Sequence, residues 1–322
     1  MTRKNLVILY NKDDWGAKRP LDQSPETRLS FEDFYTFAGE KGWNVFRASI
    51  QWFDMEKMAF KKAWTFSHGS WSKVTTLIAP DALFDKIAGK YDYSLFETKL
   101  QMSSEVPLKN SPFFRTFFDN KFSQFLAFSE YMPRTTIAEN KQQFLRLLRG
   151  AGAQKKVIKE VYGSGGKQVF IGIGNDLIKM AGTLNYPIIL QDFIETAGVP
   201  GVSAKDSVAD LRLVYIDNEL IYALSRIAKP GSLYTNFHQG AQAELVPIEK
   251  IPATCTERAE RIKGKLSQFE KTNYSLDFMF SKSGAPLFIE MNTTPGFDLL
   301  RLVGSQEIKE RYYSKMLDSF CL

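Results

Sequence analysis

The fold is decided by residues 275–296, which read Ser-Leu-Asp-Phe-Met-Phe-Ser-Lys-Ser-Gly-Ala-Pro-Leu-Phe-Ile-Glu-Met-Asn-Thr-Thr-Pro-Gly. Two segments, 275–280 and 287–292, are rich in Phe, Ile, Leu and Met, and the residues between them contain the Ser, Gly and Pro of a turn. The stretch therefore predicts a β-hairpin. A hairpin symmetric about the Ser283–Gly284 bond pairs Asp277 with Glu290, and Ser275 with Asn292.

Strand alternation divides this hairpin into a polar and an apolar face. The apolar face is expected to hold Leu276, Phe278, Phe280, Leu287, Ile289 and Met291. On the polar face, directly opposed residues have Cβ atoms about 4.5–5.5 Å apart, so the carboxylates of Asp277 and Glu290 repel each other. A hard, oxygen-seeking cation such as Mg²⁺ would remove that repulsion. The alternative interpretation is a surface hairpin with a slipped register, and the spacing alone leaves both open.

The bulk composition is that of an ordinary globular protein, with 322 residues, 44% hydrophobic and 24% charged. This length suggests two or three domains. The net charge of +6 fits a nucleic-acid binder or an anion-binding enzyme, but the basic residues are scattered and form no block. Cys255 and Cys321 match no metal or redox spacing, which favours a reducing cytoplasm. No apolar run suits a signal peptide or reaches the ~20 residues of a membrane span.

The N-terminal part predicts a parallel sheet. An apolar strand over 6–10 is followed by a polar loop, a helix ending near Gly42 and a second strand over 43–48. Such a βαβ opening is typical of α/β domains. The first strand is not followed by Gly-x-Gly-x-x-Gly, so the sequence does not support a dinucleotide site.

The middle of the chain contains a glycine-rich loop between two predicted strands. Lys159 lies at the centre of the first strand, over 156–162, and the loop 163–167 reads Gly-Ser-Gly-Gly-Lys. Such a loop can place backbone N–H groups around phosphates, although many similar loops are plain hairpin turns. It is not a Walker loop, because a strand and not a helix follows it.

A later hairpin about Asp217 and Asn218 brings Arg212 and Arg226 into one sheet.

From about residue 106 to 300 the chain resembles the ATP-grasp superfamily of carboxylate–amine ligases, and most closely its glutathione-synthetase-like and ribosomal-protein glutamate ligase branch. Seven short motifs match in order. They are Asn110-Ser111-Pro112 with Asp119-Asn120-Lys121; Ile158-Lys159 with the glycine loop; Gln191-Asp192-Phe193-Ile194; Asp210-Leu211-Arg212; Ser225-Arg226-Ile227-Ala228 with 236–240; Leu276-Asp277; and Phe288-Ile289-Glu290-Met291-Asn292 with Thr294-Pro295-Gly296.

The resemblance implies a role for each matching position. ATP phosphates would be contacted by Lys121, Lys159 and the loop residues Gly163, Ser164, Gly165 and Gly166. Adenine would be held by the hinge Gln191, Asp192, Phe193 and Ile194, with Glu195 near the ribose. Two Mg²⁺ ions, with Mn²⁺ as an alternative, would be held by Asp277, Glu290 and Asn292. The γ-phosphate and the acyl phosphate would face the catalytic residues Arg226, Asn236 and Arg212.

Two departures from the family pattern stand out. Asn120 is inserted where the family usually has Asp beside Lys, and Gly240-Ala241 stands where paired glycines are usual. Neither departure removes a charged group, so the implied activity is retained.

The resemblance also implies a domain organisation and an activity. The expected fold is α/β (α+β), with a small parallel-sheet domain over 1–110, an ATP-grasp lid over 111–190 and a C-terminal metal-bearing subdomain over 191–322. The implied enzyme is an ADP-forming ligase that joins a carboxylate to an amine through an acyl phosphate. Phosphoryl transfer needs positioned positive charge more than a covalent nucleophile, which suits the lysines and arginines.

The expected partners are small-molecule or peptide carboxylates and amines, without nucleic acid or membrane, and a homodimer stays open. A small-molecule kinase and a non-catalytic ATP-binding regulator are the alternatives on the same scaffold.

Overall fold

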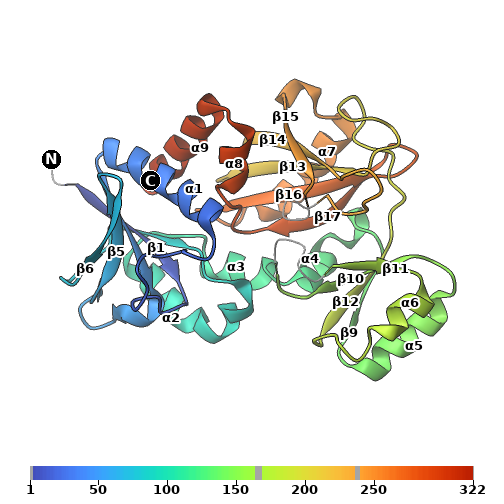
Figure 1. Ribbon diagram of the computed structural model, residues 1–322, viewed down its shortest axis with the longest axis horizontal. Helices are drawn as coiled ribbons and strands as arrows, with labels where there is room; N and C mark the ends of the chain where they lie inside the picture. Colours follow the sequence, from blue (N-terminus) through green and yellow to red (C-terminus); the bar gives the residue numbers. More distant parts are fainter. Residues whose placement is uncertain (1–2, 164–168, 236–239, 322) are drawn as a thin grey trace.

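The computed structural model describes residues 3–163, 169–235 and 240–321, which are organised around three main sheets (Figure 1). The first sheet is formed by the N-terminal third of the chain, the second by residues 135–192 and the third by residues 209–292. The division into domains over 1–110, 111–190 and 191–322 stays a prediction.

The first sheet has the strand order β6-β5-β2-β1-β7-β8. Its parallel strands are β1 (Lys4–Tyr10), β2 (Trp43–Ser49), β7 (Ala82–Asp85) and β8 (Leu108–Lys109). An antiparallel hairpin, β5 (Ala63–Ser67) and β6 (Ser70–Val74), extends one edge. Helix α1 (Pro25–Glu40) connects β1 to β2, and α2 (Asp92–Glu105) precedes β8. Because both faces of β1 are covered, its four central residues are fully buried, which confirms the predicted parallel sheet.

A small separate ribbon, β3 (Phe53–Asp54) with β4 (Ala59–Phe60), lies between β2 and β5 in the sequence.

The second sheet is antiparallel, with the order β11-β10-β12-β9. Its strands are β9 (Thr135–Ala138), β10 (Lys156–Glu160), β11 (Phe170–Gly172) and β12 (Ile188–Asp192). Two helices, α5 (Lys141–Ala151) and α6 (Gly174–Lys179), cover one face and bury Phe144, Leu148 and Leu177. The boundary predicted between residues 190 and 191 falls inside β12, so the division at this point stays a prediction.

The third sheet is also antiparallel, with the order β15-β14-β13-β16-β17. Its strands are β13 (Ala209–Ile216), β14 (Glu219–Ile227), β15 (Gln242–Val246), β16 (Asn273–Phe280) and β17 (Pro286–Asn292), and α7 (Ala253–Leu266) packs on one face. The predicted cross-strand pairs are confirmed at the open end of the hairpin, where Asp277 lies opposite Glu290 and Ser275 opposite Asn292.

At the closing end of this hairpin the predicted register is wrong by one residue. A β-bulge after Asp277 pairs Phe278 with Phe288, which leaves one extra residue in β17. Phe288 is therefore the residue that enters the apolar core. Leu287 and Ile289, which were predicted on the apolar face, do not belong to that core cluster.

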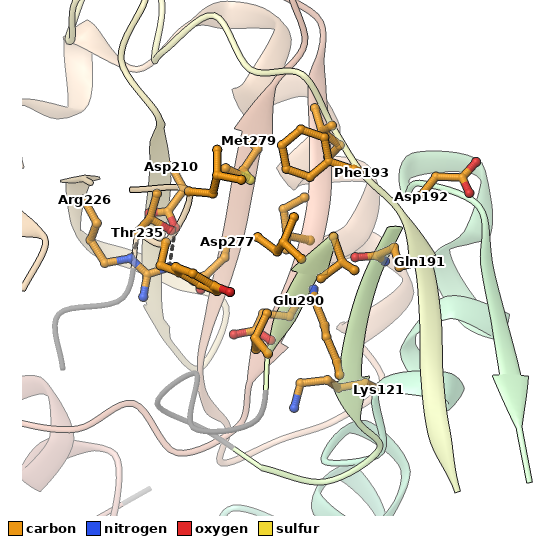
Figure 2. Close-up of a pocket in the computed structure, with 18 of the residues that line it drawn as sticks. Lys121, Gln191, Asp192, Phe193, Asp210, Arg226, Thr235, Asp277, Met279 and Glu290 are labelled. Atoms are coloured by element: carbon orange, nitrogen blue, oxygen red, sulfur yellow. Dashed lines mark hydrogen bonds and ion pairs between the residues drawn. The ribbon is translucent and has the colours of Figure 1, made fainter. Parts of the chain in front are cut away.

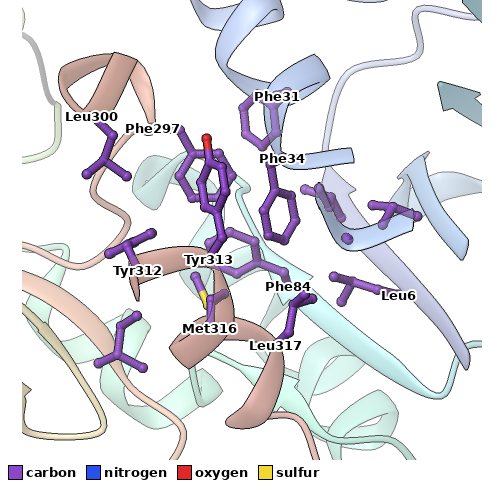
Figure 3. Packing of buried hydrophobic residues seen from close by; sticks show 14 of the residues in the cluster. Leu6, Phe31, Phe34, Phe84, Phe297, Leu300, Tyr312, Tyr313, Met316 and Leu317 are labelled. Atoms are coloured by element: carbon purple, nitrogen blue, oxygen red, sulfur yellow. The ribbon is translucent and has the colours of Figure 1, made fainter. Parts of the chain in front are cut away.

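Four further helices join the sheets. Helices α3 (Pro112–Phe118) and α4 (Lys121–Phe128) lie between the first two sheets in the sequence, while α8 (Asp298–Val303) and α9 (Gln306–Asp318) follow β17. In Figure 1, α8 and α9 lie beside α1, between the first and third sheets. Figure 3 shows the aromatic side chains of this contact, including Phe31, Phe34, Phe84, Phe297 and Tyr313.

The predicted fold class, a mixed α+β architecture, is confirmed. None of the helices in the described part of the chain has both the length and the apolar character needed to cross a membrane.

Candidate functional site

A cleft between the second and third sheets gathers most of the residues singled out in the sequence (Figure 2). The second sheet contributes β10, β11 and the end of β12, and the third contributes β13, β14, β16 and β17. Lys121, at the start of α4, and Gly163 also line it. The cleft is thus built from segments more than 100 residues apart in the chain.

Two lysines provide positive charge at one end of the cleft. Lys159 is buried in the middle of β10, and this burial lowers the pKa of its ammonium group, while the carboxylate of Glu290 acts in the opposite direction. Lys121 donates from Nζ to the carbonyl oxygen of Gly163 and from its amide to that of Val161, at 3.0 Å. Figure 2 shows Glu290 between Asp277 and Lys121. The predicted grouping of both lysines with the carboxylates is therefore present.

Gly163 opens the loop with a backbone angle that favours glycine. Its φ of 142° is in the left-handed half of conformational space, and a side chain there would also press against Glu160. The following loop residues Ser164, Gly165 and Gly166, with the predicted catalytic residue Asn236, lie outside the described residues.

The predicted adenine hinge lines the cleft with all four of its residues, Gln191, Asp192, Phe193 and Ile194. The Gln191 amide donates to the Thr135 hydroxyl at 2.9 Å, and Asp192 pairs with Lys156 at 2.6 Å. The side chains of Gln191 and Asp192 thus form their polar contacts within the second sheet. The hinge presents to the cleft its main chain and the apolar side chains of Phe193 and Ile194.

Glu195 does not line the cleft. Its side chain is 64% exposed and forms an ion pair with Lys282. The structure therefore does not bring Glu195 together with the other predicted cofactor residues.

Two arginines neutralise Asp277, whereas the hairpin sequence alone suggested a metal ion for this role. Arg212 donates from Nε and Nη2 to the two carboxylate oxygens of Asp277, at 2.7 and 2.6 Å. Arg226 donates from Nη2 to Oδ2 at 2.7 Å. Burial alone would raise the pKa of Asp277, but the charges of Arg212 and Arg226 outweigh it and hold the pKa at about 2.

Arg226 also forms a bidentate pair with Asp210, at 2.8 and 2.7 Å. Thr235 donates its hydroxyl to the same carboxylate. All four charged side chains of this cluster, Asp210, Arg212, Arg226 and Asp277, are buried. Asp210 was predicted only as part of a motif, and its partnership with Arg226 follows from the direct pairing of the two residues between β13 and β14.

The donor set of the hairpin fits Mg²⁺. A carboxylate has about four lone-pair sites, and the arginines use three of those on Asp277, which leaves one for a cation. No described residue forms an ion pair with Glu290. The side-chain oxygen of Asn292 accepts one hydrogen bond, from the Thr294 amide at 3.0 Å. Oxygen ligands of this kind suit a hard cation.

That oxygen set comprises two acids and one amide. Within residues 3–163, 169–235 and 240–321, no three His, Cys, Asp or Glu side chains are grouped closely enough to hold a metal ion. Asn292 and Arg212 do not line the cleft themselves. Asn292 is placed by its pairing with Ser275, and Arg212 contacts Asp277, which does line the cleft.

The apolar walls and one loop were missed in the sequence. Val157 and Ile171 line the cleft and are direct partners in the β10–β11 ladder. Strand alternation could have found Val157, because it lies two residues before Lys159 on the same face. Leu233, Tyr234 and Thr235 also line the cleft, but they belong to an irregular loop whose sequence carries no comparable periodic signal.

Residues 121–312, more than half of the chain, match a model of the RimK-like ATP-grasp domain. A relative named probable alpha-L-glutamate ligase, from Vibrio parahaemolyticus, is 27% identical over 181 residues. The match covers 55% of this chain and 55% of the relative, so the chain spans about half the length of the curated relatives it matches.

Two solved structures share the fold over essentially the whole chain. D-alanyl-alanine synthetase A from Vibrio cholerae has a TM-score of 0.65 at 11% identity, with all of both chains covered. The ATP-grasp ligase PsnB, solved with a phosphomimetic variant of a minimal precursor, Mg and ADP, has a TM-score of 0.61 at 14% identity, covering 99% of this chain and 100% of that one. These comparisons identify the fold as the ATP-grasp fold.

Proposed function

The chain belongs to the RimK-like ATP-grasp family, and from this we propose that it is an ATP- and Mg²⁺-dependent ligase that joins a carboxylate to an amine. The reaction would pass through an acyl phosphate and release ADP and phosphate. The observation that carries the proposal is the cleft in which Lys121, Lys159, Asp277 and Glu290 meet beside the hinge. Relatives named alpha-L-glutamate ligase make L-glutamate the first amine to test.

The residues of the cleft have separate tasks in this proposal. The main chain of Phe193 and Ile194 would hold adenine, and Lys121 and Lys159 would hold the phosphates. Arg226, fixed by Asp210, would face the transferring phosphoryl group, where positioned positive charge stabilises the transition state. Asp277, Glu290 and Asn292 would hold Mg²⁺, which when bound neutralises charge on the phosphate oxygens.

The chain's own residues would also protect the activated carboxylate. An acyl phosphate hydrolyses readily in water, so an enclosed site is needed while the amine attacks. The apolar side chains of Val157, Ile171 and Ile289 line the cleft and would exclude water from it. The net charge of +6 agrees with acidic substrates.

The test is an ADP-release assay with ATP, Mg²⁺, L-glutamate and pooled carboxylic acids and peptides, with products identified by mass spectrometry. The expected result is ADP and phosphate formation that depends on both a carboxylate and an amine. The mass of the product should equal the sum of the two substrates less one water. Formation of AMP and pyrophosphate would overturn the proposal. A stable phosphorylated product made without an amine would identify a kinase instead.

A matched pair of variants links the activity to the cleft. Glu290→Gln removes the carboxylate that forms no ion pair with a described residue, and we expect turnover to fall by about 100-fold or more, as for the loss of one major electrostatic group. Glu244→Gln makes the same chemical change at an exposed position of β15, outside the cleft, and should keep wild-type turnover.

A further inference from the structure

Strand β17 carries two of the three proposed metal-binding side chains, Glu290 and Asn292, yet it is an edge strand. The third sheet ends with β17, so only β16 pairs with its main chain inside the sheet. An unpaired strand edge leaves N–H and C=O groups that need other partners when they are buried. The residue between Glu290 and Asn292 is Met291, which is buried in the core.

Gln124, on α4, satisfies this edge at Met291. Its side-chain oxygen accepts from the Met291 amide at 2.7 Å, and its nitrogen donates to the Met291 carbonyl oxygen at 2.9 Å. The same nitrogen donates to the Phe118 carbonyl oxygen at 2.6 Å. Gln124 is 1% exposed, and three of its roughly four hydrogen-bonding positions are thus used. At Met291, the Gln124 side chain thus makes the two main-chain hydrogen bonds that a neighbouring strand would otherwise make.

Two further side chains from the same segment, the buried Asn110 and the partly buried Asp119, hold Thr293, the residue after Asn292. Asn110 donates to the Thr293 carbonyl oxygen, and Asp119 accepts from the Thr293 hydroxyl. Asp119 is itself fixed by an ion pair with the buried Arg115, at 2.8 Å. The main chain is therefore clamped on both sides of Asn292 by residues of 110–124.

We propose that Gln124 is a positioning residue that sets Glu290 and Asn292 through the main chain of Met291. Strand alternation makes the two flanking side chains share a face, so fixing Met291 fixes both of them. The inference rests on the proposed function, because it assigns Gln124 to the metal site of that function. Groups that orient metal ligands in this way commonly change metal affinity by about 10–100-fold when mutated.

Helix α4 connects this clamp to the base of the glycine loop. The amide of Lys121 donates to the Val161 carbonyl oxygen at 3.0 Å, and Asn120 donates to the Tyr162 hydroxyl at 3.3 Å. Asn120 also caps α4 by accepting from the amides of Phe122 and Ser123. The inserted Asn120 thus has a structural role. The short helix α4 connects strand β17 to the glycine-rich loop.

The test compares Gln124→Met, which keeps the approximate shape and removes all three hydrogen bonds, with wild type. The readout is the Mn²⁺ dissociation constant in the presence of AMP-PNP, measured by electron paramagnetic resonance. We expect this constant to rise about tenfold, while the affinity for metal-free nucleotide is unchanged. Thr293→Val, which removes only the bond to Asp119, should give a smaller rise in the same direction and serves if Gln124→Met does not fold.

Tyr274→Phe is the matched control. It removes one partly buried hydrogen bond, from Tyr274 of β16 to Asn218 in the β13–β14 turn at 2.7 Å, without touching residues 291–293. It should lower the melting temperature and leave Mn²⁺ affinity unchanged. The inference is overturned if Gln124→Met loses stability as Tyr274→Phe does but binds Mn²⁺ like wild type. If wild type binds Mn²⁺ and AMP-PNP but forms no ADP with any substrate pair, the proposed ligase function fails alone.

Discussion

Asp210, Arg212, Arg226 and Asp277 form a buried chain of alternating charge at the residue scale. Arg226 bonds to both carboxylates, whereas Arg212 bonds to Asp277 alone. Neighbouring strands supply the four residues. Arg212 lies opposite Asp277 in the β13–β16 ladder. Asp210 lies opposite Arg226 in the β13–β14 ladder. The cluster therefore holds both arginines in place, and under the proposed function this fixed positive charge would stabilise the transferring phosphoryl group.

The two arginines should differ in their contribution to stability. Arg226→Met leaves Asp210 buried without a cation, and we expect a loss of about 3–5 kcal/mol. Arg212→Met leaves Arg226 in contact with both carboxylates, so the loss should be smaller. Urea unfolding of the two variants measures the difference. Adding Asp210→Asn to Arg226→Met should recover part of the loss, and equal losses for the two single variants would contradict this assignment.

At the scale of the element, the β16–β17 hairpin shows how one bulge changes the alternation of side chains. Phe288 packs in the core, and the next residue, Ile289, lines the cleft together with Glu290. Two consecutive residues of β17 thus contribute to the cleft, where regular alternation would allow only one. The bulge widens the apolar wall beside the proposed metal site.

A pair of alanine substitutions tests this register. Phe288→Ala should destabilise the protein by about 3–5 kcal/mol, because it empties a core position. Ile289→Ala should have a smaller effect on stability but should weaken the binding of a fluorescent ATP analogue, because Ile289 lines the cleft. Denaturant unfolding and a nucleotide titration separate the two effects. A larger stability loss for Ile289→Ala would restore the regular register expected from the sequence.

The sequence was sufficient for features that depend on local patterns. The pairing of Asp277 with Glu290 follows from alternation about a turn, and the parallel first sheet follows from a βαβ pattern. The bulge could not be predicted, because both Phe288 and Ile289 suit either face. The role of Gln124 was equally hidden, since its partner Met291 is 167 residues away and a Phe-rich helix gives no sign of a buried amide. Long-range partners of this kind depend on the packed structure.

At the scale of the whole molecule, the C-terminal helices tie the third sheet to the first. Phe297, five residues after Asn292, is fully buried, with ring centroids 5.0 Å from both Phe31 and Phe34 and 5.4 Å from Tyr313. Lys86, directly after β7, donates to the carbonyl oxygens of Thr294 and Pro295 at 3.0 and 3.3 Å. The end of the β16–β17 hairpin is thus held against the N-terminal sheet.

Phe297→Ala should therefore loosen the connection between the two parts as well as the local core. We expect the free energy of unfolding to fall by about 3–5 kcal/mol, as for other buried aromatic residues. Amide hydrogen exchange should become faster in β1 and β7 than in β13 and β16. Phe144→Ala, in the separate core of the second sheet, is the control, because it should lower stability without this preference for β1 and β7. Uniform loss of protection in Phe297→Ala would show that the first sheet does not depend on the C-terminal helices. Selective loss would show that the position of the β16–β17 hairpin depends on the N-terminal sheet, since both are anchored on the same aromatic cluster.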